Sequence, residues 1–228
     1  MSDELRARIA AVRARVAAAA ARAGRDPSAI TVIAVSKRHA AARVAAARAE
    51  GLADFGENYA QELVAKADAV ADPGIRWHFI GRLQRNKART VVGRAALIHA
   101  VDSEALAAEI DRRAAAAGIV QPVLVAVNVA GEASKTGVDP DDTATLVAAC
   151  RALPAVRCDG LMTMPPIGDP DASRPWFRAL AALRDAVAAR HGPLPELSMG
   201  TTADFEVAVE QGATLIRIGA AIFGARPR

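Results

Sequence analysis

The chain alternates between strand-like and helix-like segments along nearly its whole length of 228 residues. The strand candidates are Thr31–Ser36, Leu52–Gly56, Arg76–Ile80, Leu97–Val101, Pro122–Val129, Arg157–Met162, Glu196–Met199 and Thr214–Ile218. The helical patterns between them lie near Ala40–Glu50, Asn58–Val70, Asn86–Val92, Ser103–Ala116, Asp141–Leu153, Arg174–His191 and Ala203–Gln211. Strands that alternate with helices in this way predict a parallel sheet.

Eight strand–helix units in about 200 residues are the smallest size at which a (β/α)8 barrel closes. We therefore predict an α/β fold with a single (β/α)8 TIM barrel and an extra N-terminal helix. A doubly wound open sheet is the alternative, because counting strands does not prove closure. The glycine-rich fingerprint G-x-G-x-x-G of dinucleotide-binding sheets does not follow the first strand.

We predict one domain over residues 1–228, with an N-terminal helix and lead-in over 1–29 and the barrel over 30–226, because no Pro/Gly/Ser-rich linker divides the chain. Asp3 and Glu4 would complement the dipole in the first turn of that helix. They favour a structural helix over a cleaved targeting segment. No signal peptide is visible, and no apolar run reaches the ~20 residues of a membrane span. We expect a cytoplasmic protein that does not bind membranes.

Charge and cysteine content exclude further classes of protein. The net charge is +4, and the arginines are scattered along helices, so the sequence gives little support for a nucleic-acid interface. Cys150 and Cys158 fit neither a metal-ligand spacing nor a disulfide framework. We predict no metal site, and we expect both cysteines to be buried as small hydrophobic residues.

Lys37 follows the apolar run Thr31–Val35 and Ser36, where a buried strand is expected to end. The carboxyl ends of such strands are where α/β folds place their chemistry. Burial lowers the pKa of a lysine and frees its amine for imine formation with an aldehyde. The alternative is a lysine that extends from a strand end into solvent.

The segments after the last two strands resemble an anion site. Ser198-Met-Gly-Thr-Thr202 places Gly200, Thr201 and Thr202 ahead of a helix, where backbone N–H groups and hydroxyls can bind phosphate. Gly219 and Ala220 follow the last strand, and many barrels bind phosphate after strands seven and eight. The alternative is a threonine N-cap after a tight turn.

Other polar residues also follow strand ends. Glu57 and Asn58 follow the second strand, although both could cap a helix, and Asp102-Ser103 is interpreted as a helix N-cap. A single His78 in an apolar strand is more often a packing residue, and methionines such as Met164 usually fill gaps in a core.

A lysine that can form an imine, facing a phosphate site across a barrel mouth, suggests pyridoxal 5'-phosphate (PLP), which has an aldehyde at one end and a phosphate at the other. The same residues permit a class I aldolase that acts on a phosphorylated sugar.

Six motifs, taken in order, resemble the pyridoxal phosphate homeostasis proteins. They are Ala34-Val-Ser-Lys37, Phe55-Gly-Glu-Asn-Tyr59, Trp77-His-Phe-Ile-Gly81, Ser134-Lys-Thr-Gly137, Gly160-Leu-Met-Thr-Met164, and Arg217-Ile-Gly219 with Ala221-Ile-Phe-Gly224. The resemblance extends from about residue 30 to 226 without a large insertion. It implies an alanine racemase-like barrel of fold type III in which Lys37 carries PLP as an internal aldimine.

The resemblance also implies roles for single residues. Thr201, Thr202, Gly219 and Ala220 match phosphate-binding turns, and Arg217 matches an arginine that faces the pyridine nitrogen. The positions that match the lining of the cofactor pocket are Asn58, His78 and Met164, and Lys135 lies in a motif at the rim. Members commonly read Gly-Met-Ser where this chain has Gly200-Thr201-Thr202, which leaves open which threonine binds the phosphate. Arg85 stands where a serine is common.

An arginine beside the pyridine nitrogen disfavours protonation there, which weakens the ring as an electron sink. Racemisation also needs a second acid/base on the opposite face. The resemblance implies that related racemases take it from a tyrosine of an extra domain, whereas this chain has one tyrosine, Tyr59. We therefore expect a monomeric PLP-binding protein of vitamin B6 homeostasis with little turnover, and PLP-dependent apo-enzymes as its partners. The alternative is a fold type III amino-acid racemase.

Overall fold

Eight parallel strands close into a barrel in the order β1-β2-β3-β4-β5-β6-β7-β8. The computed structural model describes residues 2–132, 136–166 and 169–225. The strands are β1 Thr31–Val35, β2 Asp54–Glu57, β3 Arg76–Phe79, β4 Leu97–Val101, β5 Gln121–Ala126, β6 Val156–Met162, β7 Glu196–Thr201 and β8 Leu215–Ile218. Pairing of β1 with β8 closes the barrel, which confirms the predicted (β/α)8 fold over the open sheet.

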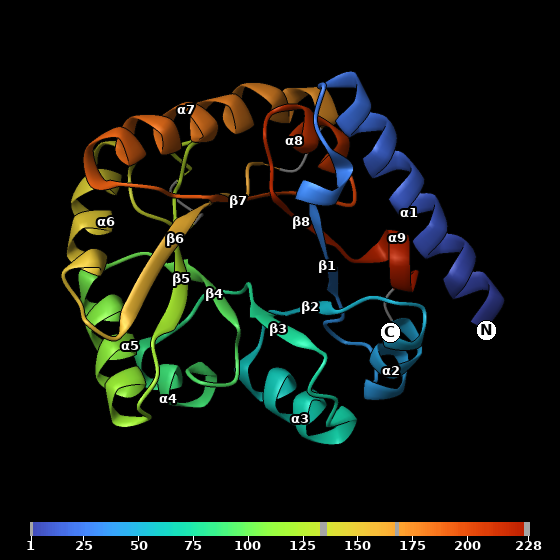
Figure 1. Ribbon diagram of the computed structural model, residues 1–228, viewed down its shortest axis with the longest axis horizontal. Coiled ribbons are helices and arrows are strands. Elements are labelled where there is room, and N and C mark those ends of the chain that lie inside the picture. The colour runs from blue at the N-terminus through green and yellow to red at the C-terminus, as the bar shows by residue number, and fades with distance from the viewer. Residues whose placement is uncertain (1, 133–135, 167–168, 226–228) are drawn as a thin grey trace.

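Helices surround the barrel and follow its strands (Figure 1). They are α1 Ser2–Arg22, α2 Ala41–Ala49, α3 Ala60–Val70, α4 Ala88–Val91, α5 Glu104–Ala116, α6 Thr143–Arg151, α7 Arg174–His191, α8 Phe205–Glu210 and α9 Ala220–Phe223. Helix α9 was not predicted; it starts directly after Gly219 at the end of β8. The N-cap prediction at Ser103 is confirmed, since its hydroxyl accepts the Leu106 N–H.

Only β4 has the predicted bounds at both ends, and three strands, β2, β5 and β7, differ from the sequence prediction by two or more residues at one end. Backbone pairing explains these three differences. Strand β2 runs over Asp54–Glu57, the stretch that pairs with β3, so Glu57 lies in the strand and not after it. Strand β7 extends past Met199 because Thr201 pairs with Arg217 of β8. Strand β5 ends at Ala126, and the following residue makes only an isolated bridge.

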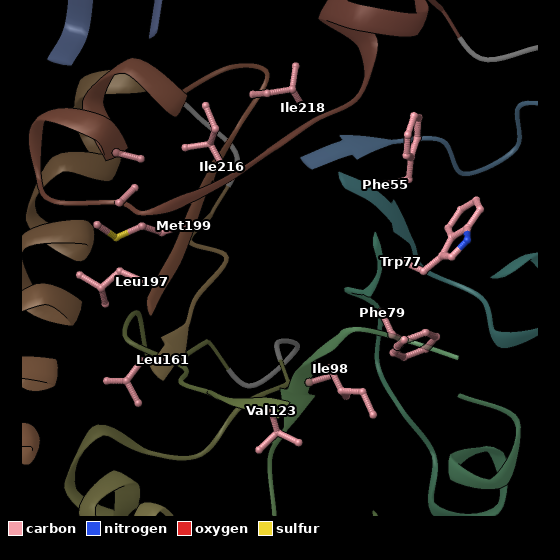
Figure 2. Packing of buried hydrophobic residues seen from close by; sticks show 14 of the residues in the cluster. Phe55, Trp77, Phe79, Ile98, Val123, Leu161, Leu197, Met199, Ile216 and Ile218 are labelled. Atoms are coloured by element: carbon pink, nitrogen blue, oxygen red, sulfur yellow. The ribbon is translucent and has the colours of Figure 1, made fainter. Parts of the chain in front are cut away.

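The main hydrophobic core lies between the barrel and its helices. Figure 2 shows side chains of this layer pointing outward from the strands, Phe55, Trp77 and Phe79 among them. A smaller apolar cluster comes from the alternate, inward-facing positions; it contains Ile33, Leu97, Leu124 and Leu215. Both cysteines are buried and free, as expected. Since the strands are buried on both faces, they read as continuous apolar runs.

Helix α1 packs against α8 and α9 (Figure 1). Its apolar residues Ile9 and Val12 are buried, and Arg15 stacks its guanidinium 4.5 Å from the ring centre of Phe205. This helix therefore supports the two helices that follow β7 and β8. None of the helices in the described residues is long and apolar enough to cross a membrane.

Candidate functional site

Lys37 lies at the carboxyl end of β1, as the sequence predicts, and is half-buried. It lines a small hollow together with Val35, Gly219 and Ala220. Parallel pairing of β1 with β8 places these segments side by side, although more than 180 residues separate them in the sequence. The structure therefore brings the predicted imine-forming lysine next to the turn that follows β8.

A buried ion pair lies behind the loop that carries Lys37. The ammonium of Lys66 donates to Glu57 Oε1 at 2.6 Å and to the backbone oxygen of Ser36 at 2.7 Å. The Ser36 hydroxyl donates to the same carboxylate oxygen at 2.6 Å. Burial raises the pKa of Glu57, although the bonds from Lys66 and Ser36 act in the opposite direction. Strand β2 and helix α3 thus hold the residue before Lys37 from two sides.

The residue after Lys37 is held by the same cluster. Arg38 has a φ of 63°, in the left-handed region that non-glycine residues rarely occupy. Its backbone N–H donates to Glu62 Oε2 at 2.8 Å, and Lys66 donates to that oxygen at 2.9 Å. Neither Glu57 nor Asn58 is the N-cap of α3, as their positions in the sequence would allow, because that residue is Tyr59, with no side-chain cap bond. Glu57 instead anchors the Lys37 loop.

The two threonines after β7 make different contacts. Thr201 donates its hydroxyl to Asp204 Oδ1 at 3.0 Å, and its backbone N–H donates to the same oxygen. The Thr202 hydroxyl oxygen accepts the N–H groups of Gly219 at 3.2 Å and Ala221 at 3.5 Å. Thr202 therefore joins the turn after β7 to the turn after β8.

Gly200 could not be another residue in this turn. Its φ is +89°, and an added Cβ would lie 2.5 Å from the Cβ of Ala208 and 3.0 Å from the Cα of Phe205. The turn therefore packs tightly on helix α8, which fixes the position of both threonines.

Arg217 lies buried near the end of β8, and its side chain is held by neutral oxygens. Its guanidinium donates to Ser198 Oγ at 2.6 Å and to the backbone oxygen of Thr163 at 2.9 Å. Burial lowers the pKa of Arg217 to about 10, against the opposing effect of Asp204. The group is still a cation at neutral pH. Two of its five N–H groups serve these bonds.

The remaining predicted site residues divide into rim and interior positions. Asn58 is half-buried, and its Oδ1 is enclosed without a hydrogen-bond partner in the described structure. Met164 follows β6 and is 51% exposed. His78 faces the barrel interior, where both ring nitrogens are within hydrogen-bond distance of other side chains. Lys135 lies outside the described residues.

Lys66, Asp204 and His99 also belong to this region, although the sequence alone does not predict it. Lys66 had a local signal, its spacing of four from Glu62 on one helix. His99 was a single polar residue within the apolar strand Leu97–Val101. Asp204 follows Thr201 by three residues, a spacing typical of capping bonds. None of these signals indicates which distant residue would be the partner.

The whole chain resembles known proteins. The model of the alanine racemase N-terminal domain matches residues 8–227. A pyridoxal phosphate homeostasis protein of Aquifex aeolicus is 43% identical over 221 residues, which cover 96% of this chain and 97% of the relative. The structure of PipY from Synechococcus elongatus with PLP bound has a TM-score of 0.84 at 34% identity and covers 96% of this chain and all of that one.

A more distant likeness concerns the fold alone. An alanine racemase of Clostridium difficile has a TM-score of 0.78 at 14% identity, covering 99% of this chain but 58% of the racemase. It agrees with the closed barrel described above. Identity above one third over nearly the full length of the first two relatives identifies the family. The chain belongs to the pyridoxal phosphate homeostasis protein family, within the alanine racemase N-terminal domain family.

Proposed function

We propose that this protein binds PLP covalently through Lys37, holds it and releases it, and so serves intracellular vitamin B6 homeostasis without substantial turnover. The observation that carries the proposal is the hollow shared by Lys37, Gly219 and Ala220. The amine of Lys37 and the turn at Gly219 and Ala220, which we assign to the phosphate, then lie next to each other, as the aldehyde and phosphate groups of PLP require. The hollow measures about 30 Å³, the room of one water, so the cofactor would lie mainly across the rim.

The covalent step needs only an unprotonated lysine. The Lys37 nitrogen attacks the aldehyde carbon of PLP, a C=N bond forms, and the aldehyde oxygen leaves as water. The reverse hydrolysis releases the cofactor, so binding and release need no other reactant. The Arg38 N–H donates to Glu62 and Lys66 donates to the Ser36 carbonyl, and these bonds on either side of Lys37 support its fixed position at the rim.

We assign the other groups of PLP to residues at or after the ends of β2, β6 and β7, which lie outside the lining of this hollow. The Thr202 oxygen already accepts two N–H bonds, so its own hydrogen remains to donate to a phosphate oxygen. The unpartnered Asn58 Oδ1 supports a role for that amide at the cofactor. Gly200 holds the phosphate turn, and Met164 offers an exposed apolar surface at the rim.

Two observations support binding over catalysis. A guanidinium has no acceptor, so an Arg217 that faces the pyridine nitrogen leaves that nitrogen unprotonated and the ring a weak electron sink. Racemisation also needs a second acid/base on the opposite face of the ring. The single tyrosine, Tyr59, is 49% exposed at the start of α3, which gives no support for such a role. We further propose that the protein acts as a cytoplasmic monomer that supplies apo-enzymes; a closed barrel, which leaves no open sheet edge, supports the monomer.

The decisive experiment is the absorbance spectrum after incubation with PLP and gel filtration, for the wild type and Lys37→Ala. We expect a visible imine band in the wild type and its loss in Lys37→Ala. Borohydride reduction and peptide mass mapping should place the adduct on residue 37. The chain has four lysines, at 37, 66, 87 and 135, so Lys87→Ala is a suitable control that should keep the band.

An equal band in Lys37→Ala, or no band in the wild type, would contradict the proposal, and the second result would favour the sugar aldolase. Conversion of L- to D-alanine by the pure protein at enzyme-like rates would instead support the racemase alternative. Size-exclusion chromatography with light scattering tests the monomer.

A further inference from the structure

A chain of hydrogen bonds crosses the barrel interior from the start of β2 to the end of β8. Asp54 Oδ1 lies 2.9 Å from His78 Nε2, and His78 Nδ1 lies 3.0 Å from His99 Nε2. His99 Nδ1 lies 2.8 Å from Ser198 Oγ, which accepts from Arg217 at 2.6 Å. All five side chains are buried. Four contacts between residues of five strands therefore connect Arg217 on β8 to the carboxylate of Asp54 on β2.

The two ends of this chain decide its direction. A carboxylate only accepts, so His78 carries its hydrogen on Nε2 and, when neutral, accepts at Nδ1. His99 must then carry its hydrogen on Nε2 and accept at Nδ1 from the Ser198 hydroxyl. At the other end a guanidinium only donates, so the Ser198 oxygen accepts from Arg217 and its hydrogen is free to point toward His99. With a neutral His78, both ends agree with the same order of donors and acceptors.

The charges along the chain agree with this direction. Burial, with smaller effects of His78 and Arg217, holds the pKa of His99 well below its usual value, so its ring stays neutral. Burial opposes ionisation of Asp54, but bonds from His78 and Arg76 outweigh it and lower the pKa of that carboxyl. Arg76 donates to both oxygens of Asp54, at 2.7 and 2.6 Å. The accepting end therefore keeps its negative charge.

We propose that His99, with His78 and Asp54 behind it, acts as a positioning residue that fixes the Ser198 hydroxyl as an acceptor and so orients the Arg217 guanidinium toward the cofactor ring. This inference rests on the proposed function for the role of Arg217, but the chain of hydrogen bonds is already present in the unliganded protein. It also gives His78 a role within the barrel instead of a contact with the cofactor. A chain of interlocked donors and acceptors holds a side chain more firmly than a single bond does.

The first test needs no cofactor. Long-range ¹H–¹⁵N spectra of the unliganded protein at neutral pH should show both His78 and His99 as neutral Nε2–H tautomers. The Arg217 guanidinium should give separately resolved Nη signals because its rotation is restricted. An imidazolium or an Nδ1–H tautomer at His99 would overturn the proposed direction.

The second test compares three interior variants. His99→Leu removes the link and should weaken PLP binding by about tenfold, the size of one lost bond to a charged group. Binding of inorganic phosphate alone should stay within about twofold, since the phosphate turn is untouched. His99→Gln can still accept from Ser198 and donate to His78, so it should restore most of the PLP affinity and the resolved Arg217 signals.

Leu124→Ala is the control for a general loss of packing. Leu124 is buried in the inward-facing apolar cluster, outside the chain of hydrogen bonds. Its variant should lower stability while keeping the Arg217 signals and the PLP affinity. If His99→Leu keeps both signals and affinity, the positioning role is wrong. If the wild type binds no PLP but the tautomers and Arg217 signals are as expected, the proposed function is wrong and the chain of hydrogen bonds is confirmed.

Discussion

At the scale of single residues, Thr201 and Thr202 show how neighbours with the same hydroxyl differ in chemistry. Thr201 donates to Asp204, whose carboxylate repels a phosphate. Thr202 keeps a hydrogen to donate. We predict that Thr202→Val weakens binding of both PLP and inorganic phosphate by about tenfold. Titration calorimetry with each ligand measures this loss.

Thr201→Val is the matched control, because it removes the same hydroxyl one residue earlier. It should cost about 1 kcal/mol of stability through the lost bond to Asp204 and leave phosphate affinity nearly unchanged. The opposite ranking of the two variants would place the phosphate at Thr201.

At the scale of elements, the Glu57–Lys66 pair joins β2 to α3 beneath the Lys37 loop. We predict that Lys66→Met lowers the free energy of unfolding by about 3–5 kcal/mol, because a buried carboxylate then loses its cation. Burial already raises the pKa of Glu57 in the intact pair. In the Lys66→Met variant, the Glu57 carboxyl should stay protonated in the folded protein at pH values at which the unfolded chain has already released this proton. In the unfolded chain the pKa of a glutamate is about 4.3. Stability should then fall as pH rises through this range.

Urea denaturation at several pH values tests this prediction. The double variant Glu57→Gln with Lys66→Met should recover part of the loss and remove its added pH dependence, since no buried charge remains. Lys87→Met serves as the control for replacing a lysine. A Lys66→Met protein as stable as the wild type would show that the ion pair does not hold β2 and α3 together.

At the scale of the whole molecule, helix α1 supports the side of the barrel that carries the turns after β7 and β8. Ile9 is 3% exposed and lies in the main core. We predict that Ile9→Ala lowers the free energy of unfolding by about 2–4 kcal/mol through the cavity it leaves. Thermal unfolding measures the loss, and Ala10→Ser, at an exposed position of the same helix, should change stability far less. Equal stability of the two variants would mean that α1 is not part of the core.

Much of the fold could be predicted because its signals are local. Strand Thr31–Val35 has the β-branched, apolar residues that suit a strand buried on both faces, and Lys37 interrupts that pattern at the strand's end. The ends of β2 and β7 could not be predicted, because they depend on which residues of β3 and β8 lie opposite. Helix α9 is only four residues long, too short to show a periodic pattern.

The sequence by itself determined the number and order of the strands, the position of Lys37 and the motifs that resemble the family. These follow from residues close together in the chain, where hydrophobic periodicity and turn chemistry act. Only the tertiary structure decided that Thr202 joins the turns after β7 and β8, and that Asp54, His78, His99, Ser198 and Arg217 form one chain. The physical reason is barrel closure: residues 99 positions apart meet inside it, and a hydrogen bond depends on distances and angles that no spacing in the sequence records.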